Sequence, residues 1–141
     1  MALKLDITYE FNFDLIGIVC PERSFKLAWQ LNQLLGIDLT RQEDIELAYL
    51  EGSILKIANF QYHTENDMYQ LLKNKAHWSL HSTKPFLLPE LKEYDYFLMI
   101  DNVTQMIDVE RIKDSLSQLT MIQYCLSIDL EQVKDRENLL F

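Results

Sequence analysis

The chain has 141 residues, of which 48% are hydrophobic and 25% are charged, and its formal net charge is −9. This length and balance are typical of one globular domain with its own core, and they exclude a disordered or fibrous chain. A strongly acidic surface repels phosphate groups, so neither nucleic acid nor an anionic membrane is expected as a partner.

The beginning of the chain does not resemble a secretory signal, because Asp6, Glu10 and Asp14 interrupt its apolar stretches. The longest apolar runs, LIGIVC and YFLMI, are far shorter than the roughly 20 residues of a membrane-spanning helix. The two cysteines, Cys20 and Cys125, have no paired spacing, so we expect free thiols. The sequence therefore predicts a cytoplasmic protein.

The first third of the chain predicts two strands and a helix. In LKLDITYEFNF (3–13), apolar side chains occupy the odd positions, which is the period of a half-buried strand. The β-branched run LIGIVC (15–20) predicts a more deeply buried strand that restarts after a bend. From Pro21, helically spaced apolar residues predict a helix, which Gly36 ends in the left-handed conformation.

Three short strands forming a small meander are expected between residues 45 and 75, with turns at EG (51–52) and TEND (64–67). YFLMI (96–100) then predicts a central strand. A second helix should follow, capped by Asp108 and carrying one narrow apolar stripe.

MIQYCLSID (121–129) alternates and predicts the last strand. Strand–helix–strand thus occurs twice, once on each side of the meander. This pattern predicts an α+β two-layer sandwich: a mainly antiparallel sheet with two helices on one face, similar to the ferredoxin-like and ACT-like folds with an interrupted double βαβ unit. The face of the sheet that carries no helices must be polar or must contact another surface. We expect a single domain over residues 1–141, with residues 130–141 as a C-terminal tail.

Motifs for common chemistry are missing from the sequence. The three glycines are not clustered, so no phosphate-binding loop is predicted. His77 and His81 are four residues apart without an evident third ligand, and no local signature surrounds a nucleophile. We therefore predict no metal, no cofactor and no catalytic residue.

The stretch LLPELKEYDYF (87–97) offers the one candidate site. Pro89 favours a tight turn that starts at Glu90, whose carboxylate could accept backbone N–H bonds, and Asp95 could cap the loop entering the next strand. Tyr94 and Tyr96 should point the same way on a strand, with one of them under a helix. A structural role in the turn explains Glu90 and Asp95 better than the alternative, in which they act as a general acid/base pair.

LPELKEYDY (88–96) resembles the signature of the uncharacterised bacterial IPExxxVDY family, with Leu88 and Tyr94 in place of its Ile and Val. The similarity extends to FDLIGI, KLAWQLNQLLGIDLTR, DYFLMI and the terminal ENLLF, and so covers nearly the whole chain. The resemblance implies no known activity, substrate or cofactor. It marks four motif positions of unknown role: Pro89, Glu90, Asp95 and Tyr96.

These observations favour a non-enzymatic cytoplasmic module that binds an unknown protein or small ligand through a sheet face or edge, with a homodimer as one arrangement. The alternative is a small enzyme that uses Glu90 and Asp95 as acid/base groups. Three apolar residues end the chain, Leu139, Leu140 and Phe141. We expect this tip to dock into its own core rather than into a partner's groove.

Overall fold

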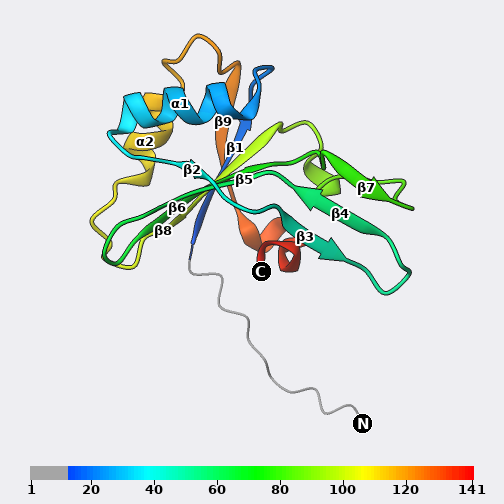
Figure 1. The fold of residues 1–141 in the computed structure, drawn as a ribbon. Coiled ribbons are helices and arrows are strands. Elements are labelled where there is room, and N and C mark those ends of the chain that lie inside the picture. Colours follow the sequence, from blue (N-terminus) through cyan, green and yellow to red (C-terminus); the bar gives the residue numbers. More distant parts are fainter. Residues whose placement is uncertain (1–12) are drawn as a thin grey trace.

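A computed structural model describes residues 13–141 of the protein (Figure 1). These residues form two α-helices and nine strands, and every strand pair is antiparallel. The α+β class predicted from the sequence is confirmed. The expected strand over residues 3–13 lies outside the described part, apart from Phe13.

The α-helices are α1 (Ser24–Leu35) and α2 (Val109–Leu116). The strands are β1 (Asp14–Val19), β2 (Thr40–Arg41), β3 (Ile45–Ala48), β4 (Ile54–Ile57), β5 (Asn59–His63), β6 (Met68–Lys73), β7 (Trp78–Leu80), β8 (Tyr96–Asp101) and β9 (Tyr124–Ile128). Short 3₁₀ helices are η1 (Pro89–Leu91), η2 (Leu130–Gln132) and η3 (Arg136–Leu139).

The larger sheet has six strands in the order β2-β5-β6-β8-β1-β9, and the smaller has three in the order β3-β4-β7. Strand β8, the YFLMI segment, lies inside the larger sheet as predicted. Because all neighbours are antiparallel, β1 and β6 run parallel with β8 between them, and β8 and β9 run parallel with β1 between them.

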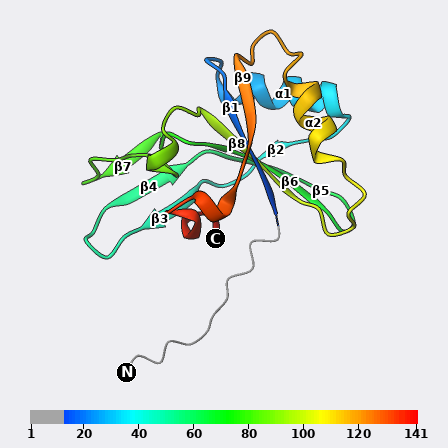
Figure 2. The ribbon, with the colours of Figure 1, turned by 180° about the vertical axis from the view of Figure 1, so that it is seen from behind.

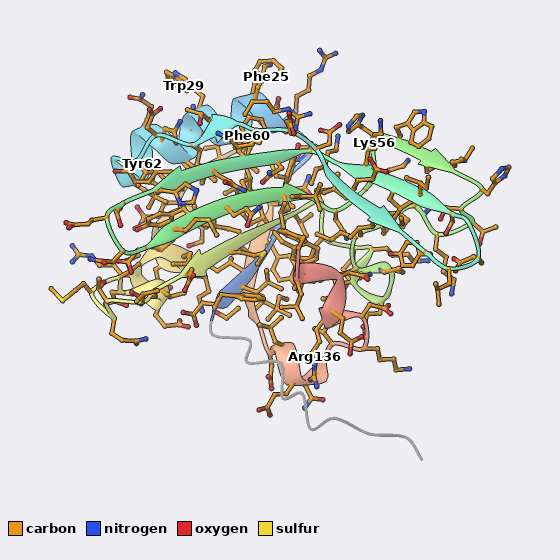
Figure 3. The ribbon with its side chains drawn as sticks, turned by 60° about the horizontal axis from the view of Figure 1, so that its bottom comes forward. Phe25, Trp29, Lys56, Phe60, Tyr62 and Arg136 are labelled. Atoms are coloured by element: carbon orange, nitrogen blue, oxygen red, sulfur yellow. The ribbon has the colours of Figure 1, made fainter. Side chains whose placement is uncertain are left out.

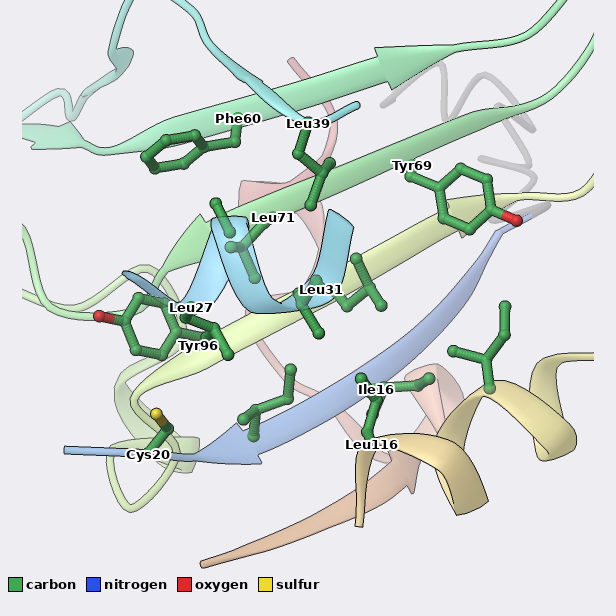
Figure 4. Close-up of a cluster of buried hydrophobic side chains, with 14 of the residues drawn as sticks. Ile16, Cys20, Leu27, Leu31, Leu39, Phe60, Tyr69, Leu71, Tyr96 and Leu116 are labelled. Atoms are coloured by element: carbon green, nitrogen blue, oxygen red, sulfur yellow. The ribbon is translucent and has the colours of Figure 1, made fainter. Parts of the chain in front are cut away.

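Both α-helices pack on the same face of the larger sheet, over a first core cluster (Figure 4). Helix α1 begins at Ser24, three residues later than the predicted Pro21, and ends as predicted at Gly36 with φ 65°. The second helix is capped as predicted, since the Asp108 carboxylate accepts the N–H of Arg111. The cluster includes Leu27 and Leu31 of α1, Ile112 and Leu116 of α2, and Ile16, Ile18, Leu71, Tyr96 and Leu98 of the sheet.

The opposite face of the larger sheet meets the rest of its own chain. A second core cluster there contains residues of the smaller sheet, the loop before β8 and the C-terminal segment, among them Leu55, Ile57, Leu87, Val133 and Leu139. Seen from behind, the C-terminal 3₁₀ helices lie on the side away from α1 and α2 (Figure 2). Residues 130–141, expected as a tail, therefore contribute to the core.

The predicted three-strand meander is wrong in one detail, because the segment from residue 53 to 63 contains two strands. They are β4 and β5, which are separated at the buried Ala58 and belong to different sheets. The chain changes sheets at this residue because Ile57 packs in the second cluster and Phe60 in the first. No helix among residues 13–141 is both long and apolar enough to span a membrane.

Candidate functional site

The motif loop, residues 88–96, is folded around the fully buried side chain of Asn74, at the end of β6. The Asn74 amide Nδ2 donates to the carbonyl oxygens of Leu91 and Tyr94, each at 2.9 Å, and its Oδ1 accepts the N–H of Leu88 at 2.9 Å. Buried polar groups are costly unless they are paired, so these bonds fix the loop. Asn74 was not predicted as a site residue; the available signal was an asparagine shortly after the strand-like segment YQLLK (69–73).

Pro89 begins a turn and Glu90 accepts backbone N–H groups, both as predicted. The N–H groups come from the C-terminal segment, which was not predicted. Leu88 is extended before Pro89, which opens η1. The carboxylate of Glu90 accepts the N–H groups of Lys134 and Asp135, the second at 3.1 Å. Glu90 therefore anchors the C-terminal segment, which is more than forty residues further along the chain.

Asp95 and Tyr96 hold the connection between β1 and α1. The Asp95 carboxylate accepts the N–H of Cys20 at 2.8 Å, and the Tyr96 hydroxyl donates to the carbonyl of Glu22 at 2.6 Å. Burial raises the pKa of Tyr96 far above its usual range, and the charges of nearby Cys20, Asp95 and Glu22 act in the same direction. The hydroxyl stays protonated at neutral pH and remains a donor.

The prediction that Tyr94 and Tyr96 point the same way is wrong. Strand β8 begins only at Tyr96, so Tyr94 still belongs to the loop and its ring enters the second cluster, while Tyr96 packs in the first cluster with α1. The Tyr94 ring covers Gly17, where an added Cβ would come within 2.6 Å of it. It also stacks on Tyr124, with centroids 5.9 Å apart and hydroxyl oxygens at 3.0 Å.

In this geometry Glu90 and Asp95 have different hydrogen-bond partners. Each carboxylate accepts backbone N–H groups, and the two serve different segments, the C-terminal segment and the end of β1. His77 pairs with Asp44. Within residues 13–141, no group of three or more His, Cys, Asp or Glu side chains is arranged to hold a metal ion.

The terminal residues divide between core and surface. Leu139 is 3% exposed and belongs to the second cluster, whereas Leu140 is 39% and Phe141 52% exposed. Two side chains on the outer side of α1, Phe25 and Trp29, are also exposed and point away from the sheet (Figure 3).

The edge strand β9 carries a further apolar group, in which two of three side chains are exposed. In the ladder between β9 and β1, Tyr124 lies opposite Val19, Leu126 opposite Gly17 and Ile128 opposite Leu15. These three β9 side chains alternate with Cys125 and Ser127, so they share one face, and we name them the edge patch. Tyr124 is 45% exposed and Leu126 43%, while β9 pairs with β1 alone in the larger sheet.

A polar hollow of about 360 Å³ lies where the smaller sheet meets the motif loop and the C-terminal segment. Its lining residues are Tyr49, Glu51, Ser53, His81, Ser82, Thr83, Lys84, Pro89, Asp135 and Asn138. Burial raises the pKa of the Tyr49 hydroxyl, and the neighbouring carboxylates of Asp135 and Glu51 raise it further. Tyr49 is thus a protonated donor beside two acids.

Comparison with known proteins supplies no function. A scan against protein-family models finds none that matches this chain, and a search of curated protein sequences finds no match. The resemblance of residues 88–96 to the IPExxxVDY signature therefore stays a prediction.

Proposed function

We propose that the protein is a non-enzymatic interaction module that binds through the edge of its larger sheet, and that the strand bound there is β9 of a second copy. The observation that carries this proposal is the lack of protection along β9. A strand at a sheet edge presents unpaired backbone groups, and natural monomers shield such edges with charges, proline, bulges or shortness.

The other sheet edges among the described residues have such protection. Strand β2 has only two residues, one of which is Arg41, and β3 carries Glu46. Strand β7 has three residues, and just before it Lys75 forms a bridge to Phe86 on the returning chain. Strand β9 has five residues, YCLSI, with neither charge nor proline.

The edge patch is complementary to itself. An antiparallel pair of β9 strands centred on Leu126 places Leu126 opposite its symmetry mate and Tyr124 opposite the partner's Ile128. Aromatic and β-branched residues that face each other across strands stabilise a sheet by roughly 0.2–1 kcal/mol per pair. Such an arrangement is closed and two-fold symmetric, as in most homodimers.

Molar mass in solution tests this proposal. The wild-type protein should form dimers whose fraction rises with concentration. Leu126→Glu would place two carboxylates opposite each other at the centre of the pairing, so this variant should have the mass of one chain. It should remain folded, and its melting temperature should not depend on protein concentration, because it no longer gains stability from association. Leu80→Glu is the matched control, since Leu80 is exposed on β7, and it should still form dimers. A wild type that remains monomeric, or a dimer that survives Leu126→Glu, contradicts the proposal.

We also infer that the larger sheet is an enlarged ferredoxin-like or ACT-like sheet. Its strands β9-β1-β8-β6 support this inference, because each of the two parallel pairs encloses one antiparallel strand and α1 and α2 cover the same face. Membership of the IPExxxVDY family and a cytoplasmic location remain proposals of the same kind. The two free cysteines of the described residues, Cys20 and Cys125, suit a reducing compartment.

The acid/base enzyme remains the weaker proposal. A catalytic pair needs two carboxyl groups that can reach one substrate, whereas the oxygens of Glu90 and Asp95 already accept main-chain N–H groups.

A further inference from the structure

The polar hollow is assembled by the motif loop. The carbonyl of Leu87 accepts the side-chain amide of Asn138 at 2.9 Å, Pro89 is part of the lining, and Glu90 accepts the N–H of Asp135 at 3.1 Å. Leu87, directly before the motif loop, and Glu90 within it thus hold the wall that the C-terminal segment contributes, and Pro89 lines the hollow beside them. Pro89 and Glu90 therefore both turn the chain and help to form the polar hollow.

The second wall, from the β3–β4 turn, is also held by its own hydrogen bonds. The N–H of Tyr49 donates to the carbonyl of Ser53 at 2.9 Å, and the Ser53 hydroxyl donates to the Glu51 carboxylate at 2.7 Å. Gly52 makes this turn possible, because its φ of 95° is a conformation that residues with a Cβ rarely adopt. Glu51 and Tyr49 are consequently presented on a fixed turn.

The third wall is the turn after β7, with the sequence HSTK. His81 has a positive φ of 54°, which is uncommon outside glycine, and the Ser82 hydroxyl accepts the N–H of Lys84 at 3.2 Å. This wall carries an ammonium group, an imidazole and two hydroxyls. It offers hydrogen-bond donors and positive charge, opposite in kind to the carboxylates of Glu51 and Asp135.

Among the described residues, none of these charged groups takes part in an ion pair, although the Glu51 carboxylate accepts the Ser53 hydroxyl. The ion pairs found within residues 13–141 involve neither Lys84 nor Asp135 nor His81. Glu90 and Asp95, by contrast, are used by backbone N–H groups. Charged groups that line one hollow without an ion-pair partner in the fold are available to a ligand.

We propose that the polar hollow binds a small zwitterion, such as a free amino acid or dipeptide, whose ammonium group meets Glu51 and Asp135 and whose carboxylate meets Lys84. The volume of about 360 Å³ lies at the lower end of the range for small-molecule sites, which suits ligands of this size. A ligand with only one charge can pair with only one of the two kinds of charge that line the hollow. This inference is independent of the β9 edge.

The test is a titration of the ¹⁵N-labelled full chain with individual amino acids and with glycylglycine, followed by backbone amide shifts. Shifts should be confined to residues 49–53, 81–84 and 135–138. Acetate and methylamine, each with one charge, should bind much more weakly. Comparing the affinities of free amino acids and glycylglycine shows whether the hollow prefers an amino acid or a dipeptide.

Variants show whether the two charged walls are responsible. Lys84→Met and Asp135→Asn should each weaken binding by about tenfold or more, because each removes a charge-assisted hydrogen bond. Lys92→Met is the control, an exposed lysine outside the hollow, and it should bind as the wild type does. The proposal is wrong if no amino acid or dipeptide shifts these amides at millimolar concentration. It is equally wrong if Lys84→Met binds as tightly as the wild type. If Asp135→Asn does not fold, Lys84→Met alone decides.

Discussion

At the residue scale, the motif acids act through hydrogen bonds to the main chain. Asp95 holds the end of β1 through the N–H of Cys20. Asp95→Asn keeps one acceptor but loses the charge, so the free energy of unfolding should fall by about 0.5–2 kcal/mol. Chemical denaturation measures the free energy of unfolding. Glu93→Gln, a substitution at an exposed position nearby, is the control. Equal stability of Asp95→Asn and wild type would show that the charge of Asp95 contributes nothing to this bond's effect on the fold.

Asp67 provides a pH-dependent test at the same scale. The hydroxyl and the N–H of Thr104 donate to its carboxylate at 2.6 and 2.9 Å, and these bonds lower the pKa of Asp67. A lowered pKa in the folded state stabilises the fold above the pKa of the unfolded chain, and this stabilisation is lost as the pH falls through the folded value.

Thr104→Val removes the hydroxyl donor at nearly unchanged volume. The pKa of Asp67 should therefore rise toward its ordinary value, and the variant should lose less stability on acidification. An NMR titration of the carboxyl carbon follows the pKa, with the exposed Thr120→Val as control. A pKa of Asp67 that is the same in Thr104→Val and wild type would contradict the assignment.

At the element scale, the C-terminal segment is part of the core. Leu139 is buried in the second cluster, whereas the adjacent Leu140 is 39% exposed. Leu139→Ala should lower the free energy of unfolding by about 2–5 kcal/mol, since it leaves a cavity. Leu140→Ala is the matched control and should cost far less. Similar melting temperatures for the two variants would mean that the segment does not support the core.

Local patterns were sufficient to predict the elements whose signals lie within a few residues. The apolar run of β8, the terminating Gly36 of α1 and the cap Asp108 of α2 were all predicted from neighbouring sequence. Each depends on local backbone geometry or on the period of burial, which a short stretch of sequence contains.

The tertiary partners of the candidate site were not predictable in this way. The acceptor role of Glu90 was expected, but its donors at residues 134 and 135 are far along the chain. The clamp formed by Asn74 depends on a buried amide meeting three loop groups. Tyr94 was misplaced because its orientation was predicted as for a strand residue, whereas β8 begins at Tyr96, as YFLMI predicted, and Tyr94 lies in the loop before it.

At the scale of the whole molecule, the two faces of the larger sheet are both covered. The α-helices cover one face, and the smaller sheet, the loop before β8 and the C-terminal segment cover the other. The larger sheet therefore has little uncovered surface except near its β9 edge. This arrangement makes an edge, rather than a face, the place where another strand can join.

Amide hydrogen exchange of β9 at several protein concentrations tests this central claim most directly. Alternate amides of an edge strand point away from its neighbour and are open to water in a monomer. If β9 pairs with a second copy, these amides in Tyr124–Ile128 should exchange more slowly as the concentration rises, while those of the protected edge β2 should not change. Exchange of the β9 amides at one rate across all concentrations would contradict the account.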